Sequence, residues 1–159
     1  MGNKRAIEVG EVQVMSAGTG LTHSEFNDSK TDEVNFLQLW IVPEEMDVEP
    51  NYEQREFDVA NQKNKLQTVV APKDKPEGDA LPISQQAYIY STDLDSGHAI
   101  TLNSKSNNHG FYVFIVEGAV ETSAKMLGKR DAVGVWEAER VDIVAKENSE
   151  IIIVEVPMN

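Results

Sequence analysis

The chain has 159 residues, of which 40% are hydrophobic and 26% charged, and these values suit a globular protein with a hydrophobic core. Its formal net charge of -13 repels phosphate groups, so we expect no binding to nucleic acid or to an anionic membrane. The absence of cysteine excludes disulfides, thiolate metal sites and a cysteine nucleophile. No apolar run is long enough to span a bilayer and no secretory signal pattern is visible, so we expect a cytoplasmic protein.

Short alternating and apolar runs predict β-strands along most of the chain. The first strand is expected within residues 6–15, and the apolar run at residues 36–42 predicts a buried strand. The polar, acidic stretch 43–65 is interpreted as a linker, and the proline-rich stretch 71–82 as a surface loop. Further strands are predicted at residues 66–70, 86–90, 99–102, 111–116, 119–122, 132–136, 140–145 and 151–156. Many short strands without a long amphipathic helix indicate an all-β sandwich or barrel protein.

A weak internal repeat divides these strands into two β units, which we place at residues 1–60 and 61–159. Residues 12–17 resemble residues 133–138, and in this register His23 falls opposite Val144 and Glu25 opposite Lys146. The strand pair at residues 111–122 precedes the repeat in the second unit and has no counterpart before Val12. We therefore expect an incomplete first barrel and a complete antiparallel second barrel from about residue 66 to residue 156.

His23 and Glu25 are the candidate metal ligands. Side chains two residues apart in a strand lie on the same face, so an imidazole and a carboxylate at this spacing can bind one divalent ion such as Fe, Mn, Ni, Zn or Cu. The glycines of Ser16-Ala17-Gly18-Thr19-Gly20 permit a tight turn just before the pair. The alternative is an exposed strand end that carries both residues by chance. Durable mononuclear sites have three or more protein ligands. The remaining histidines, His98 and His109, are expected in solvated turns and not at the metal.

Three stretches, residues 12–27, 37–43 and 50–57, resemble the pirin family, and a looser likeness continues to Pro157. The resemblance implies a bicupin, in which two cupin barrels stand in tandem and the N-terminal barrel holds one metal through three histidines and a glutamate. His23 and Glu25 match the third histidine and the glutamate, and Glu25 is also a candidate catalytic base. The other two histidines belong to a His-x-His element that this sequence lacks. Ser104 and Ser106 stand where such an element would fall in the second barrel, which is metal-free in the family.

The resemblance also implies a relationship to metal-dependent quercetin 2,3-dioxygenases, which act on a flavonol-like small molecule. Met1-Gly2-Asn3 resembles an internal segment of the family, so we expect the chain to be N-terminally truncated. With two of four ligands missing, we expect the isolated chain to be inactive and to bind its divalent metal weakly or not at all. We also expect a homo-oligomer that forms through the incomplete N-terminal sheet. Two alternatives stay open: a non-catalytic cupin module for protein interaction or regulation, and a fragment without an independent role.

Overall fold

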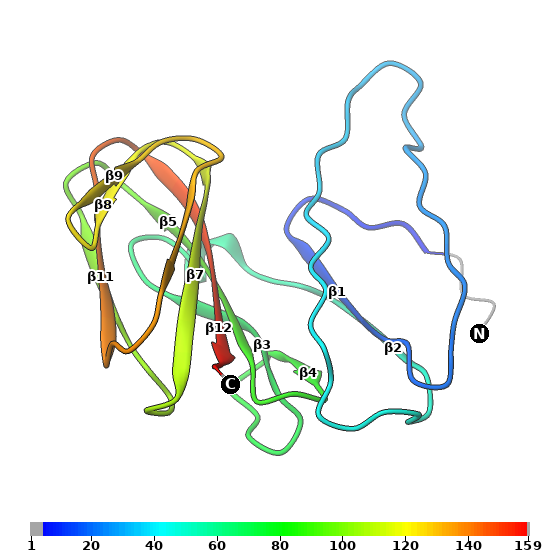
Figure 1. Ribbon diagram of the computed structural model, residues 1–159. Coiled ribbons are helices and arrows are strands. Elements are labelled where there is room, and N and C mark those ends of the chain that lie inside the picture. Colours follow the sequence, from blue (N-terminus) through cyan, green and yellow to red (C-terminus); the bar gives the residue numbers. More distant parts are fainter. Residues whose placement is uncertain (1–4, 159) are drawn as a thin grey trace.

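A computed structural model describes residues 5–158 and places nearly all of their regular structure in β-strands (Figure 1). The Met1-Gly2-Asn3 stretch, on which the expected truncation rests, lies outside the described residues. The elements are β1 (Glu11–Ser16), β2 (Asn51–Glu56), the 3-10 helix η1 (Val59–Asn61), β3 (Gln67–Pro72), β4 (Leu81–Ile83), β5 (Tyr88–Leu94), β6 (Ala99–Asn103), β7 (His109–Glu117), β8 (Val120–Thr122), β9 (Lys125–Leu127), β10 (Ala132–Val135), β11 (Arg140–Ala145) and β12 (Ser149–Pro157).

The N-terminal unit is a two-stranded antiparallel sheet of β1 and β2. Its β2 strand lies inside the predicted linker, so the linker prediction was wrong there. The sequence of β2, NYEQRE, has no apolar alternation, and the strand forms because its backbone pairs with β1 along all six residues. Two strands alone are only marginally stable in water. Here Val12 and Val14 pack against a small core that includes Phe57, Val70 and Leu81, and this contact attaches the hairpin to the second unit.

The connection between β1 and β2 carries no strand, although residues 36–42 were predicted to form a buried one. A strand needs a partner for its backbone groups, and no described residue pairs with this segment. Its large apolar side chains stay largely exposed as a result; they include Phe36, Leu37, Leu39, Trp40 and Val42. In Figure 1 the connection rises well above the β1–β2 sheet before it returns along the side that faces the second unit.

The second unit packs a six-stranded sheet, in the order β10-β7-β12-β5-β3-β4, against a four-stranded sheet in the order β6-β11-β8-β9. Inward side chains of both sheets form the main core, which includes Val113, Ile115, Ile143, Ile151 and Ile153. The named strands pair in antiparallel fashion except for β3 and β4, which are parallel. The prediction of a wholly antiparallel second barrel was therefore wrong for this one pair. Alternation of inward and outward residues explains why β6 and β11 could be recognised from sequence, whereas β7 and β12 are recognised as nearly continuous apolar runs.

The outer faces of the two sheets differ in chemistry. On the four-stranded sheet, Thr101 of β6 donates a hydrogen bond to Asp142 of β11, and both side chains are exposed. On the six-stranded sheet, the outward residues of the two paired strands are mostly apolar; on β7 they include Tyr112 and Phe114, and on β12 Ile152, Val154 and Val156. A strand that is apolar on both faces is typical of a sheet whose two faces are both covered.

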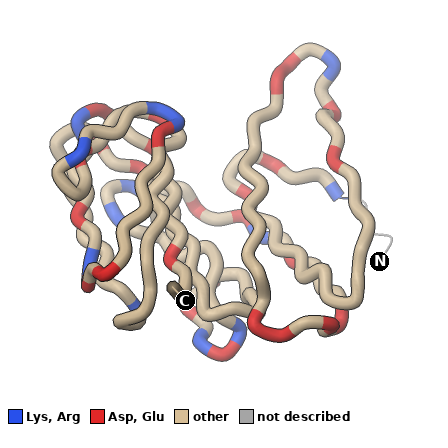
Figure 2. Tube along the Cα trace, in the orientation of Figure 1, with Lys and Arg blue, Asp and Glu red and all other residues tan. Residues whose placement is uncertain are grey.

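Charge is distributed over both units, with acidic positions outnumbering basic ones along the trace (Figure 2). Among residues 5–158 there is no helix with the length and apolar character that crossing a membrane requires.

Candidate functional site

His23 and Glu25 lie on the β1–β2 connection, and both are exposed to solvent in a stretch without regular structure. Neither therefore lies on the inner face of a strand, as the i, i+2 spacing had suggested. The turn before them does have the expected form. Gly18 adopts a φ of +53°, and an added Cβ would lie 2.0 Å from the carbonyl oxygen of Val48, so only glycine fits. The Thr19 N–H donates to that same oxygen at 3.0 Å and closes the base of the connection.

The two candidate ligands have suitable chemistry for a divalent metal, but they do not complete a site. Within residues 5–158 no group of three or more histidine, cysteine, aspartate or glutamate residues is placed to hold a metal ion. The sequence holds three histidines in all. His98 lies exposed in the turn between β5 and β6, as expected, and His109 is buried at the start of β7. The described residues thus contribute one imidazole and one carboxylate here, fewer ligands than the three or more of a durable mononuclear site.

The burial of His109 reveals a polar cluster that the sequence did not suggest. Its centre is Glu155 of β12, whose side chain is fully buried and points into the second unit with Ile151 and Ile153. One carboxylate oxygen, Oε2, accepts a 2.9 Å hydrogen bond from the hydroxyl of Tyr90. The other, Oε1, accepts from the Lys105 N–H at 2.6 Å and lies 2.9 Å from Nδ1 of His109. We call Tyr90, Ser104, Lys105, His109 and Glu155 the Glu155 cluster.

Hydrogen bonding explains how a carboxylate can be buried in this core. A buried charge is tolerated only when its oxygens are paired, and Glu155 receives donors from β5, from the β6–β7 turn and from β7. The Ser104 hydroxyl lies 3.1 Å from Oε1 and 2.7 Å from the Ser106 carbonyl oxygen, which holds the turn in place. The two serines that stand where a His-x-His would fall thus belong to a structural turn.

Tyr88 lies beside this cluster, with its ring centre 6.2 Å from that of Tyr90 and 6.5 Å from that of His109. The ammonium group of Lys105 lies 5.3 Å from the centre of the Tyr88 ring and forms an ion pair with Glu77. Burial raises the pKa of the Tyr90 phenol, and the negative charge of Glu155 raises it further. The pKa of Tyr88 is raised as well, first by burial and then by Glu77. Both tyrosines therefore stay protonated, as hydrogen-bond donation from Tyr90 requires.

Two protein-family profiles match separate stretches of the chain. The profile of the quercetinase C-terminal cupin domain matches residues 68–156, and the profile named Pirin matches residues 1–41. The chain belongs to the pirin family. This pirin is 34% identical to a quercetin 2,3-dioxygenase of Escherichia coli K12 over 161 residues, which cover 99% of this chain and 65% of that protein. It is 30% identical to a pirin-like protein of Caulobacter vibrioides, with 98% and 66% covered. It therefore spans about two thirds of the length of these relatives.

Solved structures support the same assignment. The bacterial pirin YhhW of Escherichia coli, in complex with nickel(II), superimposes with a TM-score of 0.90 at 30% identity, over 99% of this chain and 66% of that one. A quercetin 2,3-dioxygenase from Acinetobacter baumannii matches with a TM-score of 0.72 at 21% identity, which supports the fold alone. The expected architecture, a partial N-terminal cupin followed by a complete C-terminal cupin, is confirmed.

Proposed function

We propose that this pirin derives from metal-dependent quercetin 2,3-dioxygenases, and that His23 and Glu25 are the two metal ligands it contributes. The observation that carries the proposal is the His-x-Glu pair after the glycine turn, within the segment that matches the pirin profile. The relatives named quercetin 2,3-dioxygenase and the nickel complex of a bacterial pirin support a divalent metal and a flavonol-like substrate in this family. Glu25 is then also the candidate base, because a carboxylate near the substrate can accept its hydroxyl proton.

The isolated 159-residue polypeptide is proposed to be inactive toward quercetin. Two protein donors hold a transition metal less firmly than the three or four of a durable site. His98 and His109 are the only other histidines, and His109 is engaged with Glu155. Any further ligand to a metal at His23 would have to come from outside the described residues or from a second copy. Weak metal binding that depends on His23 is therefore the expected property of the isolated chain.

Isothermal titration of the 159-residue chain with nickel(II) or zinc(II) tests both parts of this proposal. The expected dissociation constant is above micromolar, His23→Ala should weaken binding further, and His98→Ala should leave it unchanged. The His98 variant is the matched control because that imidazole is also exposed. Equal metal affinity of wild type and His23→Ala would show that His23 is not a metal ligand. Sub-micromolar, His23-dependent affinity together with quercetin consumption would contradict inactivity of the isolated chain.

The alternative is a non-catalytic cupin module that acts through protein contacts. It is favoured by the apolar outer face of the six-stranded sheet, since strands that are apolar on both faces are typical of a sheet that is covered on both sides. We also propose that the chain self-associates through its N-terminal unit, where the β1–β2 connection exposes large apolar side chains. Light scattering that finds only monomer at concentrations of tens of micromolar would contradict self-association.

A further inference from the structure

A short segment between β3 and β4 makes polar contacts with both units of the chain. We call residues 73–80, of sequence KDKPEGDA, the strap. Its two ends are held together because β3 and β4 pair in parallel and the Lys73 N–H donates to the Ile83 carbonyl at 3.0 Å. The strap is therefore a closed loop that projects from the two strands carrying Val70 and Leu81 of the small core.

On the side of the second unit, the strap is held by the carboxylate of Glu77. Its Oε2 accepts a 3.0 Å hydrogen bond from the Thr68 hydroxyl of β3, and its Oε1 forms an ion pair with Lys105. The main-chain N–H of Lys105 donates to the buried carboxylate of Glu155 at 2.6 Å. Lys105 thus binds the strap through its ammonium group and the centre of the Glu155 cluster through its backbone.

On the side of the N-terminal unit, the strap is held by Arg55 of β2, whose guanidinium group donates to the Asp79 carbonyl oxygen. Only Gly78 separates Asp79 from Glu77 in the sequence, and the Ala80 N–H closes this stretch as a turn by donating to the Glu77 carbonyl at 2.9 Å. Two residues span at most about 7 Å even when fully extended. The strap therefore cannot follow a displacement of one unit beyond that length without releasing the other.

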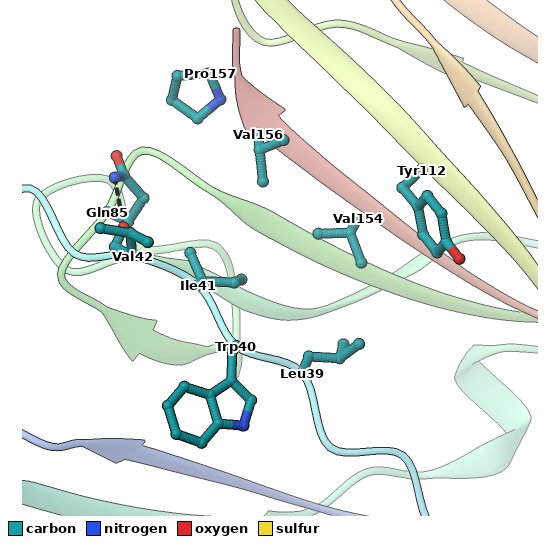
Figure 3. Close-up of a pocket in the computed structure, with 9 residues that line it drawn as sticks. All are labelled: Leu39, Trp40, Ile41, Val42, Gln85, Tyr112, Val154, Val156 and Pro157. Carbon is teal, nitrogen blue, oxygen red and sulfur yellow. Dashed lines mark hydrogen bonds between the residues drawn. The ribbon is translucent and has the colours of Figure 1, made fainter. Parts of the chain in front are cut away.

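A second connection between the units lies just after β4. Gln85 donates to the Val42 carbonyl of the β1–β2 connection at 2.8 Å, which is the dashed line in Figure 3. The next residue, Gln86, contacts two residues of the strap: its NH₂ group donates to Asp74 at 3.1 Å, and its side-chain oxygen accepts from Lys75 at 2.5 Å. The β1–β2 connection and the strap are therefore joined through two consecutive glutamines.

We infer that the strap couples the β1–β2 hairpin to the Glu155 cluster, so that the two open and close as one cooperative unit. A two-stranded hairpin is marginally stable alone and depends on its contacts with the rest of the chain. Local opening involves contiguous groups of residues, and the contacts of the hairpin and of the cluster meet on the strap within two residues. Such coupling is reciprocal, because loosening either end favours opening of the other by the same factor.

The apolar attachment of the hairpin does not provide this link. Among the described residues, the small core that contacts Val12 and Val14 has no member in common with the Glu155 cluster. The strap is therefore the element to change in a test. An effect of the strap on metal binding at His23 rests on the proposed function, whereas the coupling itself does not and is measured without metal.

Hydrogen exchange of backbone amides, followed by NMR on the full chain without metal, tests the coupling. Arg55→Met removes the contact with the hairpin and should raise the exchange rate of the Lys105 amide at least about fivefold, the lower end of the usual range for coupled sites. Lys105→Met removes the contact with the cluster and should accelerate exchange in β1 and β2 by a similar factor. Arg140→Met and Lys146→Met are the matched controls, since each breaks an exposed ion pair at β11, and both should leave these rates unchanged.

Inserting two glycines between Gly78 and Asp79 separates the two contacts of the strap while every contacting side chain is kept. Surface loops tolerate such insertions at little cost, so the variant should fold, which circular dichroism checks. In this background Arg55→Met should no longer accelerate exchange of the Lys105 amide. Three outcomes overturn the inference: acceleration confined to the unit that was changed, transmission that survives the insertion, or equal acceleration in β11, which would indicate global unfolding.

Discussion

The Tyr90 hydroxyl lies 2.9 Å from Oε2 of Glu155, and this contact joins β5 to β12 through two side chains that solvent scarcely reaches. Because Oε1 of the same carboxylate holds the β6–β7 turn and His109, a single buried glutamate connects β5, β7, β12 and the turn. The Glu155 cluster therefore has a structural role at one end of the C-terminal cupin.

Replacing Glu155 by glutamine should therefore lower the free energy of unfolding by about 1–3 kcal/mol, the cost of leaving a buried polar group unsatisfied. The glutamine amide has one oxygen to accept hydrogen bonds, and its NH₂ group would face one of the present donors. Urea unfolding measures the change. Glu139→Gln, an exposed glutamate, should stay within about 0.5 kcal/mol of wild type. Equal stability of the two variants would show that the cluster does not hold the end of the barrel.

Glu150 stands opposite Asp93 on one side and Glu117 on the other in the six-stranded sheet. Partial burial raises the pKa of its carboxyl above the ordinary value of 4.5, and the two like charges raise it further. Ionised Glu150 is thus disfavoured in the folded state. The penalty is absent below pH 4.5, where the unfolded chain is also protonated, and it reaches its full size above the raised folded pKa.

Glu150→Gln should consequently be more stable than wild type at pH 7 and no more stable at pH 4. The gain should be small because the side chain is exposed to screening by solvent. Urea unfolding at the two pH values measures it, with Glu139→Gln as the control. A gain that is equal at both pH values would not come from the titration of Glu150.

The β8–β9 hairpin turns through two residues, Ser123 and Ala124, with positive φ angles of 49° and 58°. Two-residue turns of this kind favour asparagine followed by glycine, because a side chain at positive φ crowds its own backbone. Ala124→Gly should raise the free energy of unfolding by about 0.5–1 kcal/mol. Thermal unfolding measures this gain, and a lower melting temperature would contradict the strained turn.

Gly118 connects β7 to β8 with a φ of +85°, and an added Cβ would lie 2.3 Å from the carbonyl oxygen of Asn148. Gly118→Ala should destabilise the fold by more than about 2 kcal/mol, because backbone strain and a clash add together. Gly97 has nearly the same φ, +86°, with nothing within 4 Å of the added atom. Gly97→Ala should therefore cost only the strain of about 1–2 kcal/mol. Equal losses at the two positions would mean that the backbone relieves the clash.

The sequence was most informative where a strand's own residues decide its structure. The alternation in β11 and the apolar runs of β7 and β12 were enough to place these strands, since burial of one face follows from the pattern itself. The polar strand β2 was missed because it depends on a ladder with β1, about 40 residues earlier in the chain. Residues 36–42 have the composition of a buried strand, but no described strand pairs with them, so composition alone predicted the wrong environment.

The same limit applies to the polar residues. His109 sits between turn-forming residues and was expected in solvent, but it is 6% exposed because Glu155, 46 residues later, lies beside it. A glutamate inside an apolar strand was the one local signal of this cluster, since a carboxylate among inward-facing isoleucines requires partners. His23 and Glu25 could be named from their spacing and the glycine turn. Their irregular, exposed surroundings could not be predicted, because the spacing alone does not decide whether a segment becomes a strand.

The position of β12 has a consequence for biosynthesis. This strand follows both β5 and β7 along the chain, yet it lies between them in the six-stranded sheet, hydrogen-bonded to β5 on one side and β7 on the other. Until the ribosome has released residues 149–157, β5 and β7 cannot be bridged, and the nascent sheet presents two incomplete halves. The C-terminal cupin can therefore close only once residues 149–157 have been synthesised, and the edges of β5 and β7 must be protected until then from pairing with neighbouring chains.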